Sequence, residues 1–177
     1  MFLKKFKDNL KIRAARKFIK RELESPSNTP KGRVGITTIG CIVNLDEFKD
    51  VESFNEFAEE FSLPPNSVKV IGYKAVGDNN SPFGTPTFSD EDLGFKAKIE
   101  NSYALEFLEG EYDVLVNYYT REQLPLRLMS VKTKARLKVG FGGVNEKIND
   151  LILNTPINDF QTFKKEMRKY LGVLNEI

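Results

Sequence analysis

Hydrophobic and polar positions follow two different periods along most of the chain, one typical of strands and one typical of helices. Short apolar runs predict strands that are covered on both faces, as in a parallel sheet. Segments with apolar residues three or four positions apart predict helices instead. The predicted strands are residues 36–44, 68–74, 95–99, 112–119, 135–141 and 151–153. The predicted helices beyond residue 34 are 46–62, 102–108, 125–132 and 159–174, the last with Asn158 as its N-cap and Gln161 as capping-box partner.

This alternation of strands and helices predicts an α/β protein, built as a three-layer sandwich with a mainly parallel, Rossmann-like sheet. The first strand, the helix after it and the second strand form one unit, whose crossover we expect to be right-handed. Residues 34–177 then make a single α/β domain. Residues 25–33 (SPSNTPKGR) have the composition of a linker, and residues 75–92 form a long loop rich in Gly, Pro, Asn and Ser. Loops of that length are uncommon in compact domains and often have a function.

Residues 2–24 predict a separate amphipathic helix, because straight-chain residues and Ala dominate and neither Gly nor Pro occurs. Its apolar positions fall into two stripes, each with the spacing of a helix face. The first stripe is Phe2, Leu3, Phe6 and Leu10, and the second is Ile12, Ala15, Ile19 and Leu23. The stripes lie on different faces, so we expect the second half of the helix to pack on the domain and leave the first half for a partner.

The charge of the chain is unevenly distributed. Residues 1–24 carry nine Lys or Arg against three Asp or Glu, whereas the rest of the chain carries 18 basic and 22 acidic residues. A basic arm on a mildly acidic body is drawn to anionic surfaces. We therefore predict a docking surface made of the basic and apolar residues of this helix. Its members are Phe2, Leu3, Lys4, Lys5, Phe6, Lys7, Leu10, Lys11, Arg13, Arg16, Lys17, Lys20 and Arg21.

Two anionic partners suit this helix. On a membrane, the bulky apolar stripe dips into the interface while the lysines stay at the level of the headgroups. On RNA or the ribosome, the basic residues neutralise phosphates, and the scarcity of aromatic residues favours backbone contact over sequence recognition. Because the apolar stripe begins at residue 2, the membrane surface is slightly favoured. Two further alternatives are a helix docked on its own acidic body and a protein partner of the body.

Composition narrows the available chemistry. The chain has no His, which removes Ser-His-Asp and Cys-His sites and imidazole-based zinc sites. Its one cysteine, Cys41, lies in an apolar strand, so we expect a buried thiol and a reducing compartment. Neither a run of ~18–20 apolar residues nor a secretory signal is recognised. We expect a cytoplasmic protein, attached at the inner face of the membrane where it docks there, that is not an enzyme and needs no cofactor or metal.

An alternative function lies at the carboxyl ends of the predicted strands, where open α/β sheets bind their ligands. Arginine there can grip a phosphate with two donors, and glycines can offer backbone N–H groups, although the third glycine of a dinucleotide fingerprint is missing. Asn44 and Asp46 are better explained as helix N-caps, and residues 90–92 (DED) as a helix start or a solvated loop. A nucleotide- or phosphate-binding protein or enzyme would use Asn117, Tyr119, Arg121, Gly140, Gly142 and Gly143.

Four segments follow one another along the chain: IGCIVNLDEFKDVESFNEFAEEF, DLGFKAKI, YDVLVNYY…LPLRLMSVKTKARLKVGF and NDLILNT…FQTFKKEMRKYLGVLNEI. With the basic helix before them, they resemble a small uncharacterised bacterial domain family, which implies a lone Rossmann-like half without an assigned activity. Within residues 112–141, the YDVLV strand, a Leu-rich helix and the ARLKVGF strand are also similar to a segment of heptosyltransferase-type glycosyltransferases. Those enzymes hold the nucleotide-sugar in a second half-domain, so we do not expect this shorter chain to transfer a sugar.

Overall fold

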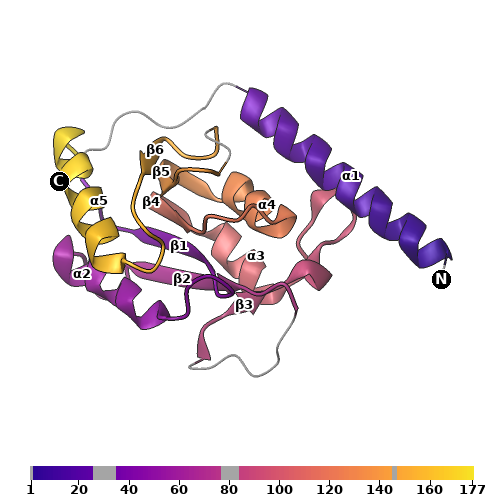
Figure 1. The fold of residues 1–177 in the computed structure, drawn as a ribbon, viewed down its shortest axis with the longest axis horizontal. Coiled ribbons are helices and arrows are strands. Elements are labelled where there is room, and N and C mark those ends of the chain that lie inside the picture. Colours follow the sequence, from indigo (N-terminus) through magenta and orange to yellow (C-terminus); the bar gives the residue numbers. More distant parts are fainter. Residues whose placement is uncertain (1, 26–34, 77–83, 145–146) are drawn as a thin grey trace.

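Six strands form one parallel sheet in the computed structural model, in the order β3-β2-β1-β4-β5-β6 across the sheet (Figure 1). The structure describes residues 2–25, 35–76, 84–144 and 147–177. The strand order reverses between β1 and β4 at the centre of the sheet. The strands are β1 (Ile39–Asn44), β2 (Val68–Tyr73), β3 (Thr87–Phe88), β4 (Glu111–Tyr118), β5 (Lys134–Phe141) and β6 (Leu151–Leu153). The predicted α/β class and Rossmann-like parallel sheet are confirmed.

The two central strands are buried because helices cover both faces of the sheet. All six residues of β1 are buried, and β4 is buried from Tyr112 to Tyr118. The register of the two strands places Cys41 beside Val116. Continuous burial of this kind explains why both strands are mostly apolar in the sequence, with Asn44, Asp113 and Asn117 as buried polar exceptions.

Helical layers on the two faces of the sheet complete the predicted three-layer sandwich. Helices α1, α3 and α4 contribute to one apolar cluster, and η1, α2 and α5 contribute to a second cluster on the other face. Figure 1 shows α2 and α5 together at one end of the body and α1 at the other. The helices are α1 (Phe2–Glu24), η1 (Val51–Asn55), α2 (Glu56–Glu60), η3 (Asp90–Asp92), η4 (Phe95–Ala97), α3 (Ser102–Glu109), α4 (Leu124–Lys132) and α5 (Phe160–Val173).

Aromatic rings fill much of the cluster under α5. The ring of Tyr118 on β4 lies 5.0 Å from those of Phe54 and Phe163, between centroids, in edge-to-face geometry. Phe160 approaches Phe54 at 5.1 Å. The Tyr118 hydroxyl donates a hydrogen bond to the Ile157 carbonyl oxygen at 2.8 Å, so its polar tip is satisfied at the edge of an apolar layer.

The predicted helix 46–62 is shorter than expected and begins as a 3-10 helix. Asp46 lies in a turn after β1, and regular α-helix is confined to α2. The cause is local, because the Asn44 side chain accepts a hydrogen bond from the Asp46 N–H at 3.1 Å and the Asp46 carboxylate accepts one from the Ala75 N–H at 3.1 Å. Both side chains hold a turn between β1 and η1, so the expectation that they cap a helix is wrong.

Two further predicted elements are wrong in part. The predicted strand 95–99 is the 3-10 helix η4, closed by an isolated antiparallel bridge between Leu93 and Ile99. The predicted loop 75–92 contains β3 and η3, while residues 77–83 of that loop lie outside the described residues. Both predictions were wrong for the same reason. The elements β3, η3 and η4 are only two or three residues long, which is too short for a periodic pattern to distinguish a strand from a 3-10 helix.

The cap of the last helix also differs by one residue. The Asp159 side chain, rather than that of Asn158, accepts the hydrogen bond from the Thr162 N–H, at 3.0 Å. Gln161 is not a capping-box partner, because its side-chain amide donates to the carboxylate of Glu56 across the α2–α5 contact. The carboxylate is the stronger acceptor for the first turn of a helix.

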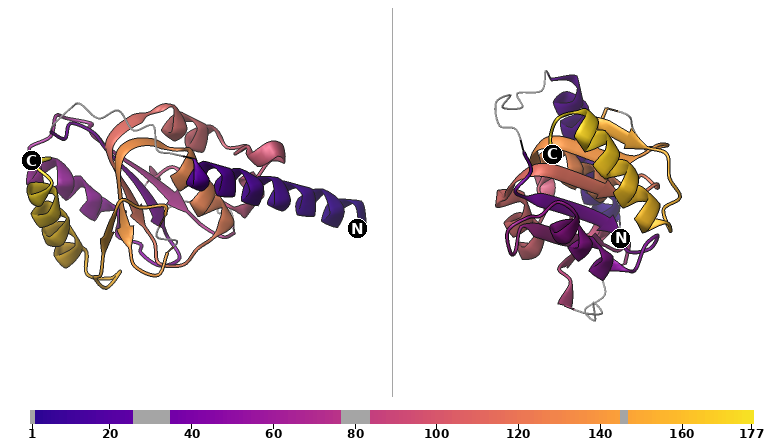
Figure 2. Two further views of the ribbon diagram at one scale, coloured as in Figure 1. Left: turned by 90° about the horizontal axis from the view of Figure 1, so that it is seen from above. Right: turned by 90° about the vertical axis from the view of Figure 1, so that its left-hand side faces the viewer.

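Helix α1 packs mainly on α4 and η4, and its first half extends beyond the body (Figure 2). Ala15 and Ile19 are buried in the same cluster as Ala97 of η4, so the second half of α1 packs on the domain as its apolar stripe predicts. In contrast, every side chain from residue 3 to residue 10 is exposed. Apart from Ser25, the predicted linker 25–33 lies outside the described residues, as does the side chain of Phe2.

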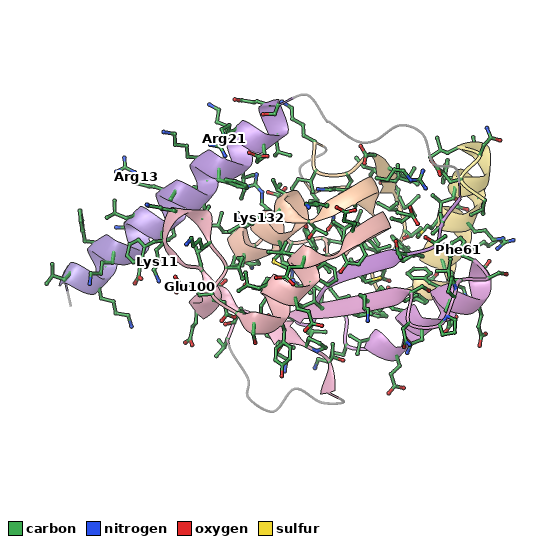
Figure 3. The ribbon with its side chains drawn as sticks, turned by 180° about the vertical axis from the view of Figure 1, so that it is seen from behind. Lys11, Arg13, Arg21, Phe61, Glu100 and Lys132 are labelled. Atoms are coloured by element: carbon green, nitrogen blue, oxygen red, sulfur yellow. The ribbon has the colours of Figure 1, made fainter. Side chains whose placement is uncertain are left out.

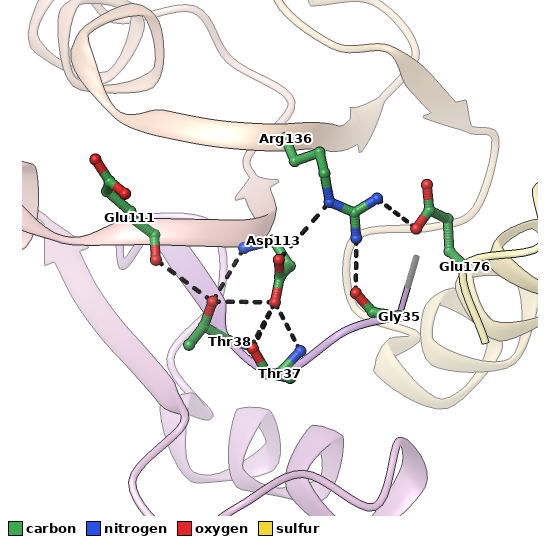
Figure 4. A network of polar contacts seen from close by, with 7 residues as sticks. All are labelled: Gly35, Thr37, Thr38, Glu111, Asp113, Arg136 and Glu176. Carbon is green, nitrogen blue, oxygen red and sulfur yellow. Dashed lines mark hydrogen bonds and ion pairs between the residues drawn. The ribbon is translucent and has the colours of Figure 1, made fainter. Parts of the chain in front are cut away.

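A polar network ties four distant segments together near the amino ends of the central strands (Figure 4). Asp113 on β4 accepts hydrogen bonds from the backbone N–H groups of Thr37 and Thr38 at 2.7 and 3.1 Å. Arg136 on β5 places its Nε 3.7 Å from Asp113 Oδ1, donates to the Gly35 carbonyl oxygen at 2.8 Å and pairs with Glu176. The first described residues of the domain and its C-terminal end are thereby attached to the same two strands.

Candidate functional site

The contact between α1 and the domain is apolar at its centre and lined with cations along its edges. Ala15 and Ile19 form the centre. On one edge, Lys11 Nζ lies 5.3 Å from the centroid of the Phe95 ring, and on another, Lys132 Nζ lies 4.2 Å from that of Phe18. Contacts of this kind between a cation and an aromatic ring are attractive. They hold α1 at a defined angle on α4 and η4.

Burial at this contact changes the titration of Lys132. Its removal from water lowers the pKa of the Lys132 amine from its ordinary value, and the nearby Glu22 carboxylate opposes part of that shift. The amine nonetheless has an aromatic face and a carboxylate beside it, which favour the charged form. Lys132 therefore belongs to the α1–α4 contact, whereas Glu22 lies at its border, near Lys132 and beside the exposed Arg21.

The face of α1 that points away from the domain carries a continuous row of side chains, which we call the outward stripe. Its members follow one another by three or four residues, and each is exposed. At 100° per residue this row lies on the opposite side of the helix from Ala15 and Ile19. Figure 3 shows Arg13 and Arg21 on that outer side, and Lys11 and Lys132 on the inner side. The outward stripe consists of Leu3, Phe6, Leu10, Arg13, Lys17 and Arg21.

The outward stripe changes its chemistry halfway along. Leu3, Phe6 and Leu10 expose 72, 55 and 42% of their surface, which is unusual for three bulky apolar residues in a row. The next three members are cations. The Arg21 guanidinium also donates to the adjacent Glu22 carboxylate at 3.1 Å, in an exposed pair that water screens. The stripe is thus apolar toward the free end of α1 and basic toward the domain.

The structure separates the predicted docking residues into those on the outward stripe and those turned toward the body. Lys4, Lys11 and Arg16 line a groove of about 710 Å³ between α1, η3 and the start of α4. That groove also contains Asp8, Asp90, Glu91 and Gln123, so its charges are mixed. Lys5 and Lys7 are exposed on the flanks of the first half, and Lys20 lies on a flank of the second half.

At the carboxyl edge of the sheet, the crevice between β1 and β4 is occupied by a side chain of the protein itself. The Glu47 side chain is only 4% exposed. Its Oε2 accepts hydrogen bonds from the backbone N–H groups of Thr120 and Arg121 at 3.0 and 3.2 Å and from the Asn44 amide at 2.9 Å. Its Oε1 accepts one from the Thr120 hydroxyl. The donors that a ligand's anionic group would use in this crevice are already paired with a carboxylate.

The six residues predicted to form a ligand edge are not gathered around one open site. Arg121 is largely exposed, with its Nε 3.9 Å from Glu47 Oε1. The Asn117 side chain is buried, donates to the Asn149 oxygen at 2.7 Å and accepts from the Ser130 hydroxyl at 2.7 Å.

Tyr119 shares the Ser130 hydroxyl with Asn117, at 2.8 Å, inside the cluster under α4. Burial raises the pKa of the Tyr119 hydroxyl far above its ordinary value, so it stays neutral. Asn117 on β4 and Tyr119 just after β4 therefore form a structural network in the core and do not reach a surface where a ligand binds.

The glycines of the predicted edge are explained by close side-chain contacts or by backbone conformation. A Cβ on Gly140 would lie 2.3 Å from the Asn149 amide nitrogen, and one on Gly142 would lie 2.5 Å from Asn154 Oδ1. Gly143 has φ +85°, which other residues rarely adopt. Gly140 and Gly142 thus allow side chains to approach the backbone closely, and Gly143 allows the chain to turn, as predicted for this segment.

The other candidate residues have structural roles in the described part of the chain. Cys41 is buried, and burial raises the pKa of its thiol well above the ordinary value. The Asp90 carboxylate accepts a hydrogen bond from the Tyr73 hydroxyl at 2.7 Å, and the Asp92 carboxylate accepts one from the Ser89 N–H at 2.7 Å. No group of three or more potential ligands that could hold a metal ion occurs among the described residues. None of the described helices has the length and apolarity needed to cross a bilayer.

Glu47 and Arg136 are the residues that sequence reasoning missed. Glu47 stands three residues after Asn44, at the end of the first strand, and that position was assigned to a helix. Arg136 stands in an alternating strand, on the face opposite Ala135 and Leu137. The sequence did contain a hint of the role of Arg136. Asp113 is a charged residue inside an apolar run, and a buried carboxylate needs a partner of opposite charge.

Comparison with known proteins adds a family but no activity. The model of a family described as "Family of unknown function (DUF6913)" matches residues 11–174 of the chain. No curated protein and no solved structure matches the chain. The matched residues include the second half of α1 and all six strands.

Proposed function

The chain belongs to this family of unknown function, and on that premise we propose that it is a non-enzymatic module which docks on an anionic membrane surface through the outward stripe of α1. The observation that carries the proposal is the outward stripe itself. Leu3, Phe6 and Leu10 are exposed on a helix that extends beyond the body, and Arg13, Lys17 and Arg21 continue the same row. The protein would attach peripherally, with the axis of α1 parallel to the bilayer.

The position of the domain allows this orientation. An amphipathic helix binds a bilayer by lying flat in the interface, which requires one complete face to be free of its own protein. Ala15 and Ile19 hold the domain against the opposite side of α1, and Figure 1 shows the body on one side of that helix. The members of the outward stripe are exposed along the helix, as contact with a flat surface requires.

The apolar half of the stripe favours lipid over nucleic acid. Removing a Leu or Phe side chain from water is worth about 1.5–3 kcal/mol, and each basic residue beside an anionic bilayer adds about 1 kcal/mol. Phosphate contacts on RNA use the cations alone and gain nothing from Leu3, Phe6 or Leu10. A partner that covers both halves of the stripe therefore makes use of more of the exposed surface.

The alternative function at the carboxyl edge of the sheet has less support. Glu47 already pairs with the N–H groups of Thr120 and Arg121, and Asn117 and Tyr119 are committed to the core. An anionic ligand there would have to displace a buried carboxylate from four hydrogen bonds. Such an exchange costs more than binding at a free site.

Flotation of the full chain with vesicles tests the proposal. Vesicles of phosphatidylcholine with phosphatidylglycerol supply the anionic surface, and pure phosphatidylcholine supplies the neutral control. The triple variant Leu3→Ser, Phe6→Ser, Leu10→Ser should bind about tenfold more weakly or worse, because it loses the insertion of three side chains. A matched control is Leu105→Ser, Val173→Ser, Leu174→Ser, which replaces three equally exposed apolar residues on α3 and near the end of α5 and should bind like the unaltered chain.

A second experiment distinguishes a membrane partner from an RNA partner. The variant Arg13→Gln, Lys17→Gln, Arg21→Gln should lose both affinity and salt dependence on the anionic vesicles. Sedimentation with ribosomes is run beside it. If the chain pellets with ribosomes but not with vesicles, and the triple Ser variant pellets equally well, the membrane proposal is wrong and RNA is the partner.

Point variants test α1 better than removal of the whole helix does. Deleting residues 1–24 would take Ala15 and Ile19 out of a buried cluster and uncover the apolar surfaces of α4 and η4. Loss of binding would then be confounded with damage to the domain. Deleting residues 2–10 avoids this problem, because the side chains of that segment that the structure describes are exposed.

A further inference from the structure

A small hollow lies beside the second half of α1, on the flank between the outward stripe and the face that packs on the domain. Its volume is about 210 Å³. Three segments of the chain line it. These contribute Arg16, Ile19, Lys20, Leu23 and Glu24 from α1, Arg127 from α4, and Lys147 from the segment between β5 and β6.

Positive charge dominates the lining of this hollow. Four of the described lining residues are cations, and Glu24 is the one acid among them. Lys20 Nζ lies 3.9 Å from Glu24 Oε1, but both side chains are largely exposed, so water screens their attraction. Arg16 and Lys20 are exposed cations on one flank of α1, and an anion placed between them and Arg127 is attracted to all three.

Arg127 is the part of the lining that is fixed in place. Its side chain is three-quarters buried, and its Nη1 lies 3.5 Å from Glu122 Oε2. Its Nε is buried and has no hydrogen-bond partner among the described residues. The guanidinium is planar and carries several donors in a fixed geometry, which suits a tetrahedral oxyanion that accepts several hydrogen bonds at once.

The apolar part of the lining favours an anion attached to carbon. Ile19 is buried and Leu23 is half-buried, and together they form a wall beside the cations. A wall of this kind excludes water on one side, which strengthens charge interactions inside the hollow. It also offers a contact surface for the carbon skeleton of an ester. A phosphate ester satisfies both the cations and the wall.

We propose that this hollow is a binding site for the phosphate group of a phosphomonoester, held by Arg127, Arg16 and Lys20. The same group occurs on small soluble esters and on the headgroup of phosphatidic acid. The site is separate from the outward stripe, since none of the six stripe residues lines the hollow. A variant can therefore lose docking through the outward stripe while it keeps phosphate binding in the hollow, or the reverse.

Isothermal titration with glycerol phosphate and with inorganic phosphate tests the soluble source. The full chain should show saturable binding, while sodium chloride at the same ionic strength should not compete. Arg127→Gln should weaken binding about tenfold or more, because it removes a charge-assisted donor pair. Lys165→Gln is the matched control, since it removes one exposed cation from α5 on the opposite face of the sheet.

The double variant Arg16→Gln, Lys20→Gln protects the test against misfolding, because both side chains are exposed and lie outside the core. It should weaken phosphate binding while circular dichroism and the unfolding transition stay unchanged. Saturable binding that neither this variant nor Arg127→Gln alters would place the anion elsewhere and overturn the proposal.

Vesicles distinguish the lipid source. Flotation compares phosphatidylcholine vesicles that contain phosphatidic acid with vesicles that contain phosphatidylglycerol at equal surface charge. Stronger binding to phosphatidic acid that Arg127→Gln abolishes assigns the site to a lipid headgroup. Binding of soluble phosphate alone assigns it to a small molecule. Absence of both overturns the proposal, whereas loss of vesicle binding in the Leu3, Phe6, Leu10 triple variant concerns only the outward stripe.

Discussion

The Glu47 carboxylate pairs with the hydrogen-bond donors at the carboxyl edge of the sheet, where a ligand was predicted to bind. That carboxylate replaces a ligand in the crevice between β1 and β4, where it joins the β1–η1 turn to the segment after β4. Removing it leaves two backbone donors without an acceptor. The crevice is therefore stabilised from within the chain.

We expect Glu47→Ala to lower the free energy of unfolding by about 2–3 kcal/mol, because four hydrogen bonds to a charged acceptor are lost and three of their donors are partly shielded from water. Urea unfolding at neutral pH measures the change. Glu52→Ala, which truncates an exposed carboxylate on η1, serves as control and should change it by less than about 0.5 kcal/mol. Equal effects in the two variants would mean that the Glu47 hydrogen bonds contribute nothing.

Asp113 gives the protein a defined response to acid. Burial alone would raise the pKa of its carboxyl, but hydrogen bonds from Thr37 and Thr38 and the charge of Arg136 outweigh burial and lower that pKa below its ordinary value. A carboxyl whose pKa is lower in the folded state stabilises the protein above its unfolded pKa of about 3.9, and the contribution disappears as pH falls through the folded pKa.

Asp113→Asn should therefore be less stable than the unaltered chain at pH 7, and the two proteins should converge as the pH falls below about 4. Urea unfolding at a series of pH values gives both curves. Curves that stay parallel down to the acid end would show that the carboxyl titrates alike in the folded and unfolded chain.

At the scale of single elements, α1 divides into an anchoring half and an exposed half. Ile19→Ala should destabilise the domain by about 2–4 kcal/mol, since it opens a cavity in the α1–α4–η4 contact. Leu10→Ala, made in the same helix, should change stability by less than about 0.5 kcal/mol because that side chain already faces water. Thermal and urea unfolding of both variants decide it, and a similar loss in each would place Leu10 in a contact with the domain.

The elements that could be predicted from the sequence are those with long or uninterrupted patterns. Strands β1 and β4 are mostly apolar, and α5 repeats its apolar positions over four turns, so these elements appear within three residues of their predicted bounds. The errors fall where side chains override periodicity. Asn44 and Asp46 hold a turn in place of a helix start, and η4 replaces a strand because a left-handed Lys96 bends the chain.

The outward stripe was accessible to the same reasoning, whereas the hollow was not. Helical spacing alone separates Leu3, Phe6 and Leu10 from the half that anchors α1. The hollow combines Arg16 with Arg127 and Lys147, residues far apart along the chain, and only the packing angle of α1 on α4 brings them together. Periodicity describes one element at a time and contains no such angle.

At the scale of the whole molecule, Arg136 links the two ends of the domain. It contacts Asp113 on β4, the backbone at Gly35 and Glu176 near the C-terminus, while its side chain is only 14% exposed. Arg136→Gln should cost about 2–3 kcal/mol, less than a fully buried pair, because its partners keep some access to water. Urea unfolding measures this cost, and Lys134→Gln, an exposed neighbour on β5, is the control. An effect no larger than that of Lys134→Gln would assign closure of the domain to the apolar clusters alone.

The exposed half of α1 also has a kinetic consequence. A short helical segment without packed side chains is only marginally stable in water, so its backbone amides should exchange with solvent faster toward Leu3 than at Ile19. A surface that covers the outward stripe would slow this exchange. Part of the binding free energy would then offset the entropy lost when the exposed half of α1 becomes ordered. Binding would therefore be weaker than the contact area suggests, and readily reversible. On the proposed membrane surface, the exposed half of α1 would stay bound while anionic lipid is present and would dissociate as the charge of that surface falls.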